Sequence, residues 1–386
     1  MKAIVTGMIG TFPLGGVAWD YCQYAVGLEQ LGLEVYYLED SGDPTYAFVP
    51  STQRFEVDPD YGAAFLQESL AAFSETLANR WHFRSAEDHT YGMSAEEFAD
   101  IAADADMLIN VSGATVLRDT YRRCRRKVLI DTDPGWNHFR TFPRWDRKPV
   151  AERPLGFRSH DYFFTFAERV HEPDCSLHDF GLQWHTTRHP VLLDKWAPLG
   201  AGERYTTLMS WNTFRKPVKG AGICYGSKEM EFHRIEQLPN RVQWCLEVAV
   251  DGDVPKERWQ ELGWSVVSGG ATSRTARTYH DYVAGSRGEL SVAKNIYVAT
   301  NSGWFSGRSA CYLAAGRPVI LQNTGFSQLL PVGEGLLTFS NIEEAARALD
   351  HVESNYSIHQ RRAREMAETY LDSRLVLGEI LSIIGV

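Results

Sequence analysis

The strongest constraint on the fold comes from residues 1–40, which have the pattern strand, loop, helix, strand. Residues 2–7 form a short apolar run, and the loop at residues 10–16 is rich in glycine and proline. Residues 17–31 place apolar side chains at helical spacing, and residues 33–38 form a second apolar strand. A strand, a crossover helix and a second strand predict parallel pairing, and therefore an open α/β sheet.

The same pattern recurs along both halves of the chain. Further strands are expected in the first half at residues 106–111, 127–130 and 162–166, and in the second half at residues 206–211, 243–250, 265–268, 294–300 and 318–322. The repetition indicates a parallel sheet in each half, with ligands bound where the strands end at their carboxyl edge.

The length of 386 residues exceeds what one hydrophobic core usually supports, so two domains are expected. The stretch 196–203 is rich in small and turn-forming residues and marks the boundary. We therefore predict an α/β protein with two Rossmann-like, doubly wound domains that face a cleft, at residues 1–195 and 205–365. A helical pattern runs over residues 357–384. We expect its C-terminal part, in residues 366–386, to cross back and pack on the first domain.

Composition excludes several classes of protein. The net charge of −10 argues against a nucleic-acid binder, and the basic run at residues 122–127 is expected to be a solvated helix end. Six scattered cysteines without a C-x-x-C pair predict neither a zinc site nor a disulfide framework. Without a signal-peptide core or an apolar run of membrane-spanning length, a cytoplasmic protein with no transmembrane segment is expected.

The most informative segment is Asn301–Gln328, which has the pattern strand, glycine-rich loop, helix, turn, strand, loop. Ser306, Gly307, Arg308 and Ser309 fall at the start of the helix, where free backbone N–H groups and the positive end of the helix dipole favour a phosphate. Arg308 adds a charged donor. The alternative is an ordinary turn in which Ser306 caps the helix.

This segment resembles the donor-binding region of glycosyltransferases with the two-domain GT-B architecture. Asn301-Ser302-Gly303-Trp304-Phe305-Ser306 is followed by Gly316-Arg317-Pro318 and then by Ser327-Gln328, in the order of the family motif. The resemblance implies a diphosphate held at Ser306 and its neighbours, near Trp304. It also implies donor-sugar contacts from a loop with four candidate residues, Gly325, Phe326, Ser327 and Gln328.

The chain departs from the family pattern at several positions. Asn301 stands where the family has a phosphate-binding His, and Ser309 or Cys311 stands near the place of a ribose-binding Glu. The paired glutamates of many retaining members fall on Gly303 and Cys311. These departures leave the donor and the stereochemical outcome open.

Other polar residues near strand ends are donor-site candidates. Arg287 and Lys294 are candidate phosphate ligands, and Glu289 is a substitute for the missing ribose carboxylate; a surface ion-pair cluster is the alternative. After the first strand of the second domain come Trp211, Asn212 and Lys228. For Lys228, pairing with neighbouring glutamates on a helix surface is the alternative.

In the first domain, the loop with Gly15 and Gly16 borders the donor phosphates in the family, and two carboxylates are candidate catalytic bases. Asp20 lies one turn into the first helix. Asp133, in the tripeptide Asp131-Thr132-Asp133 at a strand end, is the favoured base, with a pKa raised by the charge of Asp131. The alternatives are a turn-forming role for both carboxylates, or a Mg²⁺ site between them.

The resulting expectation is a glycosyltransferase of the hexosyltransferase type, serving carbohydrate or natural-product biosynthesis. It would use a nucleotide-diphosphate sugar as co-substrate, a small-molecule or glycan hydroxyl as acceptor, and no metal or other cofactor. It is expected to act as a monomer or homodimer. A nucleotide-sugar epimerase on the same fold and a non-catalytic nucleotide- or glycan-binding protein are the alternatives.

Overall fold

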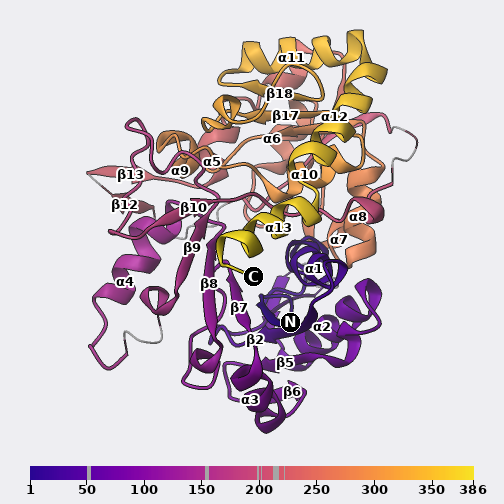
Figure 1. Ribbon diagram of the computed structural model, residues 1–386. Helices are drawn as coiled ribbons and strands as arrows, with labels where there is room; N and C mark the ends of the chain where they lie inside the picture. The colour runs from indigo at the N-terminus through magenta and orange to yellow at the C-terminus, as the bar shows by residue number, and fades with distance from the viewer. Residues whose placement is uncertain (50–53, 153–155, 198–199, 201, 212–216, 221) are drawn as a thin grey trace.

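The computed structural model describes residues 1–386 except 50–53, 153–155, 198–199, 201, 212–216 and 221. Two parallel-dominated sheets lie in the two halves of the chain, one in the indigo and magenta part and one in the orange part of Figure 1. The predicted α/β class with two Rossmann-like domains is confirmed.

The first sheet has the strand order β10-β9-β8-β7-β1-β2-β5-β6, with parallel pairing everywhere except between β5 and β6. Its strands are β1 (Lys2–Thr6), β2 (Glu34–Glu39), β5 (Trp81–Arg84), β6 (Thr90–Gly92), β7 (Met107–Val111), β8 (Arg126–Asp131), β9 (Tyr162–Thr165) and β10 (Trp184–Thr186). The helices of this half are α1 (Gly15–Gln30), α2 (Pro59–Phe73), α3 (Ala95–Asp104) and α4 (Phe142–Asp146), and a hairpin joins β3 (Tyr46–Val49) to β4 (Arg54–Val57).

The second sheet is fully parallel, in the order β15-β14-β11-β16-β17-β18. Its strands are β11 (Arg204–Leu208), β14 (Cys245–Ala249), β15 (Ser265–Val267), β16 (Gly288–Ser291), β17 (Val319–Gln322) and β18 (Leu336–Phe339), and a hairpin joins β12 (Val218–Gly220) to β13 (Ile223–Tyr225). The helices are α5 (Lys228–Phe232), α6 (Lys256–Glu261), α7 (Gly269–Thr272), α8 (Ala276–Ala284), α9 (Asn295–Ala299), α10 (Gly307–Ala314), α11 (Ile342–Ser354), α12 (Tyr356–Tyr370) and α13 (Ser373–Ile383).

Both sheets share one topology. Chain order reverses at β1 in the first sheet, between β2 and β7, and at β11 in the second, between β14 and β16. In open parallel sheets, ligands bind at such a switch point, outside the carboxyl ends of the strands.

Helix α1 is buried on almost every side. It packs on the first sheet, on α2, on α8 of the second half and on the C-terminal α13. The apolar positions predicted at helical spacing account for only part of the buried surface of α1, because the second half of the chain covers the side that would otherwise face solvent. The start of α1 is thereby fixed against the other domain.

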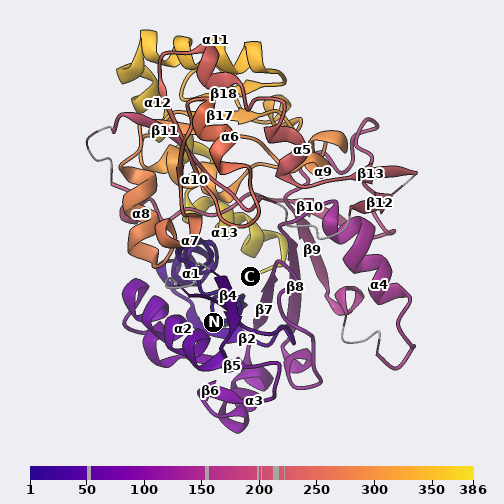
Figure 2. The same cartoon turned by 180° about the vertical axis from the view of Figure 1, so that it is seen from behind.

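The C-terminal helical pattern is divided. Helix α12 packs on α10, and the yellow α13 reaches α1 near the C-terminus, as Figures 1 and 2 show from opposite sides. The predicted crossing back to the first domain is confirmed, but a single helix over 357–384 is wrong. Asp372 breaks the pattern because its side chain accepts a hydrogen bond from the Arg374 amide (2.9 Å) and caps α13, while its backbone bridges to Val191.

A second correction concerns residues 294–300, which form the helix α9 and not the predicted strand. The strand is β16, four fully buried residues that include Glu289 and Ser291. A sequence pattern reveals a buried strand through a run of apolar residues. The sequence does not predict β16, because this strand buries polar side chains.

Candidate active site

A cavity of about 990 Å³ lies between the two domains. In the second domain it is lined by residues that follow the carboxyl ends of β11, β14 and β15: Leu208–Trp211, Asp251–Asp253 and Gly269, Gly270 and Ser273. In the first domain it is lined by Leu14–Asp20 in part, after β1, and by Thr132 and Asp133, after β8. The cavity thus lies at the switch points of both sheets.

The start of helix α10 faces this cavity. Ser306 is the N-cap, and its Oγ accepts a hydrogen bond from the Ser309 amide (3.4 Å). The amides of Gly307 and Arg308 donate to no described residue, and Ser306, Gly307 and Arg308 all line the cavity. Two free amides at the positive end of a helix form a site for an anion.

Arg308 is held rigidly beside these amides. Its guanidinium donates to Glu289 Oε1 (2.8 Å), to the Leu208 carbonyl (2.6 Å) and to Ser291 Oγ (2.8 Å). Glu289 is 0% exposed and lies behind Arg308, outside the cavity lining. Glu289 therefore serves as the counter-charge of Arg308, and its predicted contact with a ribose is not supported by its position.

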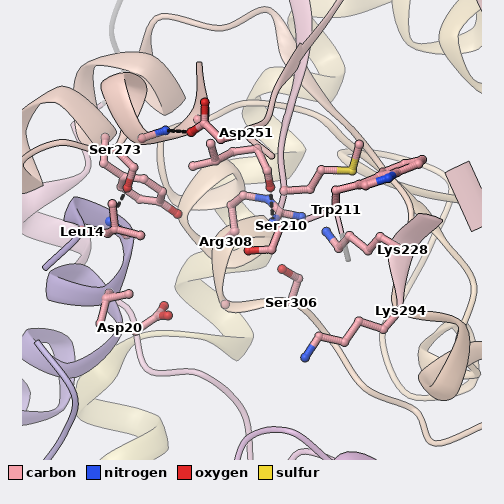
Figure 3. Close-up of a pocket in the computed structure, with 18 of the residues that line it drawn as sticks. Leu14, Asp20, Ser210, Trp211, Lys228, Asp251, Ser273, Lys294, Ser306 and Arg308 are labelled. Carbon is pink, nitrogen blue, oxygen red and sulfur yellow. Dashed lines mark hydrogen bonds between the residues drawn. The ribbon is translucent and has the colours of Figure 1, made fainter. Parts of the chain in front are cut away.

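Two lysines complete the positive side of the cavity, as Figure 3 shows. Lys294 precedes α9, and its Nζ donates to Asp133 Oδ2 (2.6 Å). Lys228 begins α5 and is only 7% exposed. Burial first, and then the positive charge of Arg308, lower the pKa of Lys228 well below its ordinary value, although the charge of Glu289 opposes this.

Asp20 lies across the cavity, on the N-terminal helix α1. Its side chain is 53% exposed, to the cavity between the domains, and no described residue donates a hydrogen bond to it. The protein around the cavity raises the pKa of Asp20 to about 7 by desolvation, and the charge of Arg308 opposes the rise. A carboxyl group with such a pKa can exchange a proton near neutral pH.

His189 lies behind Asp20, with its Nε2 3.7 Å from Asp20 Oδ1. The Gln23 side-chain oxygen accepts from the Leu192 amide (3.2 Å), so the Gln23 nitrogen donates to His189 Nε2 (2.9 Å). His189 is thereby fixed with a lone pair on Nε2, and burial lowers its pKa to about 4. It offers Asp20 neither a hydrogen nor a positive charge.

Asp133 has a different environment from the one predicted. Both of its oxygens are engaged by the second domain, one by Lys294 and the other by the hydroxyl of Tyr297. It is Asp131 whose pKa is raised, to about 7, by burial and also by the charge of Asp133. Asp133 therefore joins the two domains and is less available as a base than Asp20.

Asp131 and Asp133 do not converge on a common metal position. The Asp131 carboxylate accepts from Asn137 Nδ2 (2.6 Å) and Thr165 Oγ1 (3.0 Å), whereas Asp133 faces Lys294. Among the described residues, no group of three or more His, Cys, Asp or Glu side chains could hold a metal ion. The structure gives the alternative of a Mg²⁺ site at this tripeptide no support.

The amides of Gly15 and Gly16 are already occupied. Gly15 donates to the Ser273 carbonyl (2.5 Å) and Gly16 to Ser273 Oγ (2.8 Å). Gly16 lines the cavity, but the two amides that would face the donor phosphates bind Ser273 of the second domain instead.

The predicted sugar-facing loop lies elsewhere. Gly325, Phe326, Ser327 and Gln328 are not among the residues that line the cavity. Gly325 lies against Arg169 of the first domain, as does Gly303, where a Cβ atom would lie 2.7 Å from Arg169 Cγ. Both glycines have positive φ (+99° and +76°), so the two loops close around this arginine. They form an interface between the domains.

The remaining candidates divide between the cavity and other places. Trp211 and Trp304 line the cavity, and Trp304 stacks on Tyr297 with ring centroids 4.2 Å apart. Arg287 lies outside the lining, because it pairs with Glu353 (2.6 Å) and stacks on Tyr356. Ser309 is buried, and Asn212 falls outside the described residues.

Sequence reasoning missed several lining residues. Asp251 and Asp253 directly follow the predicted strand 243–250, so their position at a strand end was a usable signal. Ser273, Tyr279 and Tyr297 carried no such signal, since they reach the cavity from helices or helix ends whose placement depends on the other domain.

Comparison with solved structures identifies the fold of this chain. No family model and no curated protein matches the chain. AviGT4, a glycosyltransferase involved in avilamycin A biosynthesis, is similar in structure with a TM-score of 0.54 at 14% identity, covering 99% of this chain and 96% of that one. An alpha-glucosyltransferase in complex with UDP gives 0.57 at 11% identity, with full coverage of both chains at 100%.

Anabaena HepE in complex with UDP and glucose gives a TM-score of 0.58 at 10% identity, covering 100% of this chain and 99% of that one. In addition, no described helix is long and apolar enough to cross a membrane. At these identities the likeness is one of fold, and the chain has the GT-B architecture of these glycosyltransferases.

Proposed function

We propose that the protein is a glycosyltransferase that moves a sugar from a nucleoside-diphosphate donor to a hydroxyl of a small molecule or glycan, without a metal ion. One observation carries the proposal. The free amides at the start of α10 share a cavity with Arg308, Lys228 and Lys294, at the switch point of a GT-B fold. We call these amides and three side chains the phosphate clamp.

The clamp suits a diphosphate leaving group. Negative charge develops on the leaving phosphate as its bond to the anomeric carbon breaks, and donors that are already in place stabilise it without reorganisation. The three hydrogen bonds that fix Arg308 provide such preorganisation. Cations and a helix dipole supply this charge stabilisation, so the proposal requires no metal.

Asp20 is the proposed general base. The acceptor oxygen attacks the anomeric carbon as Asp20 takes the hydroxyl proton, and the nucleoside diphosphate leaves with the bonding electrons. The raised pKa of Asp20, about 7, matches a base that works near neutral pH. Leu14, Val17 and Trp304 line the cavity together with Asp20 and offer apolar surface to a sugar ring or an aglycone.

Calorimetry with a series of nucleoside diphosphates, followed by turnover assays with the matching sugar donors, tests the proposal. UDP is the first ligand to try, because two of the similar structures contain it. We expect Arg308→Gln to abolish binding. Arg277→Gln is the control, since this arginine lies on the same domain with a side chain that is 88% exposed. Binding of no nucleoside diphosphate, or unchanged binding by Arg308→Gln, would refute the proposal.

A further inference from the structure

The three cations of the phosphate clamp differ in their counter-charges. Arg308 pairs with Glu289, and Lys294 pairs with Asp133. Lys228 Nζ forms no hydrogen bond or ion pair with any described residue, although its position in the cavity lining is shown in Figure 3. It is the clamp residue whose charge the protein leaves unbalanced.

The charged groups around Lys228 do not balance a positive charge on its amine. Arg308 and Lys294 bring like charges from α10 and from the residue before α9. The opposite charge that acts on Lys228 is Glu289 on β16, whose Oε1 already accepts from Arg308 and whose Oε2 accepts from no described residue. On α5 itself, Glu229 accepts from the Ser227 amide (3.3 Å), and Glu231 accepts from Asn295 (2.7 Å) and Gln322 (2.6 Å).

An ammonium group is strongly disfavoured in such a place. Burial of the Lys228 side chain, which is 7% exposed, reduces the hydration of its amine, no described acceptor replaces the lost water, and two neighbouring cations repel a positive charge there. The neutral amine avoids both costs, and the lowered pKa of Lys228 has this same cause. A diphosphate in the clamp would reverse the balance, because it brings acceptor oxygens and several negative charges to the amine.

We propose that Lys228 is an uncharged amine in the empty cavity and takes up one proton from solvent when a nucleoside diphosphate binds. This inference rests on the proposed function. The proton goes to the Nζ lone pair, and it returns to solvent when the diphosphate product leaves. Lys228 is thereby a specificity-determining residue, since a nucleoside monophosphate brings less negative charge and draws the proton less strongly.

Titration calorimetry of UDP binding at pH 8, in buffers with different ionisation enthalpies, measures this proton directly. For the wild-type protein we expect uptake of about one proton per UDP bound, and a Kd that rises about tenfold per pH unit in alkaline solution. Lys228→Arg keeps a positive charge that does not titrate in this range. This variant should bind UDP with no proton uptake and with a Kd independent of pH.

Two further variants separate the possible sources of a proton. Lys228→Gln should bind UDP weakly and without uptake, and should discriminate less between UDP and UMP. Asp20→Asn should keep the uptake, because Asp20 is not the group invoked. Uptake that persists in Lys228→Arg, or no uptake in a wild-type protein that binds UDP, would overturn the inference. Failure of every nucleoside diphosphate to bind would instead count against the proposed function.

Discussion

At the scale of single residues, the two carboxylates of the first domain that line the cavity differ in what surrounds them. Asp133 is held by Lys294 and Tyr297, whereas Asp20 receives no hydrogen bond from a described residue. A base must be free to approach the acceptor hydroxyl, and its proton affinity must suit the working pH. Asp20 meets the first condition better than Asp133, and its pKa of about 7 meets the second.

The roles of the two carboxylates lead to a prediction. Asp20→Asn should lower kcat by about 10²–10⁴-fold and leave the Kd for the donor nearly unchanged, because general-base catalysis is lost while the clamp stays intact. Asp20 must be deprotonated to act, so wild-type kcat should rise as pH increases through about 7. Steady-state rates over a pH series measure both effects.

Asp133→Asn is the matched comparison. It should lower kcat much less than Asp20→Asn and should keep the rise through pH 7, since Asp133 joins the domains. Equal losses in the two variants, or a pH profile that is unchanged in Asp20→Asn, would contradict the assignment of the base to Asp20.

Several of the predicted site residues that line the cavity have positions that follow from local structure. Ser306, Gly307 and Arg308 reach the cavity because a helix start exposes its own amides. Arg287 and Glu289 are candidates because they are charged and lie in a polar stretch that leads into a predicted strand, but in the structure they pair with Glu353 and with Arg308. Such partners come from tertiary packing, which a single sequence does not reveal.

At the scale of elements, the two glycine-containing loops around Arg169 show a second limit on what the sequence alone predicts. Residues 301–303 and 324–328 have the sequence of a ligand-binding region, but they enclose an arginine of the first domain. Asn301 adds a hydrogen bond to Asp174 (2.8 Å), which itself pairs with Arg169. Glycines permit close approach of any group, and the sequence does not say whether that group is a ligand or a side chain.

This interface can be tested with Gly303→Ala. Its positive φ costs an alanine about 1–2 kcal/mol, and the collision with Arg169 adds about 1–3 kcal/mol of lost stability. Gly181→Ala is the control, because Gly181 also has positive φ (+65°) but has open space where its Cβ would lie. Urea unfolding measures both. Equal destabilisation in the two variants would show that the loop at Gly303 does not pack closely on Arg169.

At the scale of the whole molecule, contacts between the domains flank the cavity. Ser273 binds the start of α1, Lys294 and Tyr297 bind Asp133, and the Trp304 indole donates to the Thr132 carbonyl (3.2 Å). The sequence predicts two domains and a cleft, since each domain forms its own parallel sheet. It does not predict their relative orientation, which depends on these few polar contacts between residues far apart in the chain.

Ser273 provides the clearest test of that orientation. Helix α1 has Leu14 at its N-cap and no side-chain cap of its own, so its first amides depend on Ser273 of the other domain. Ser273→Ala removes the acceptor of the Gly16 amide and should cost about 0.5–2 kcal/mol, as the loss of a helix cap does. Hydrogen exchange should become faster at Gly16, whereas the Gly15 amide keeps its bond to the Ser273 backbone carbonyl.

The same variant should leave exchange in the middle of α13 unchanged, because α13 packs against Gly27 near the end of α1, far from the first turn of α1. Ser273→Thr, which keeps the hydroxyl, should preserve the slow exchange at Gly16. If exchange at Gly16 is equally fast in the wild type and in Ser273→Ala, the Ser273 hydroxyl does not cap α1 in solution. Faster exchange confined to the start of α1 would instead show that Ser273 of the second domain caps the first helix of the first domain.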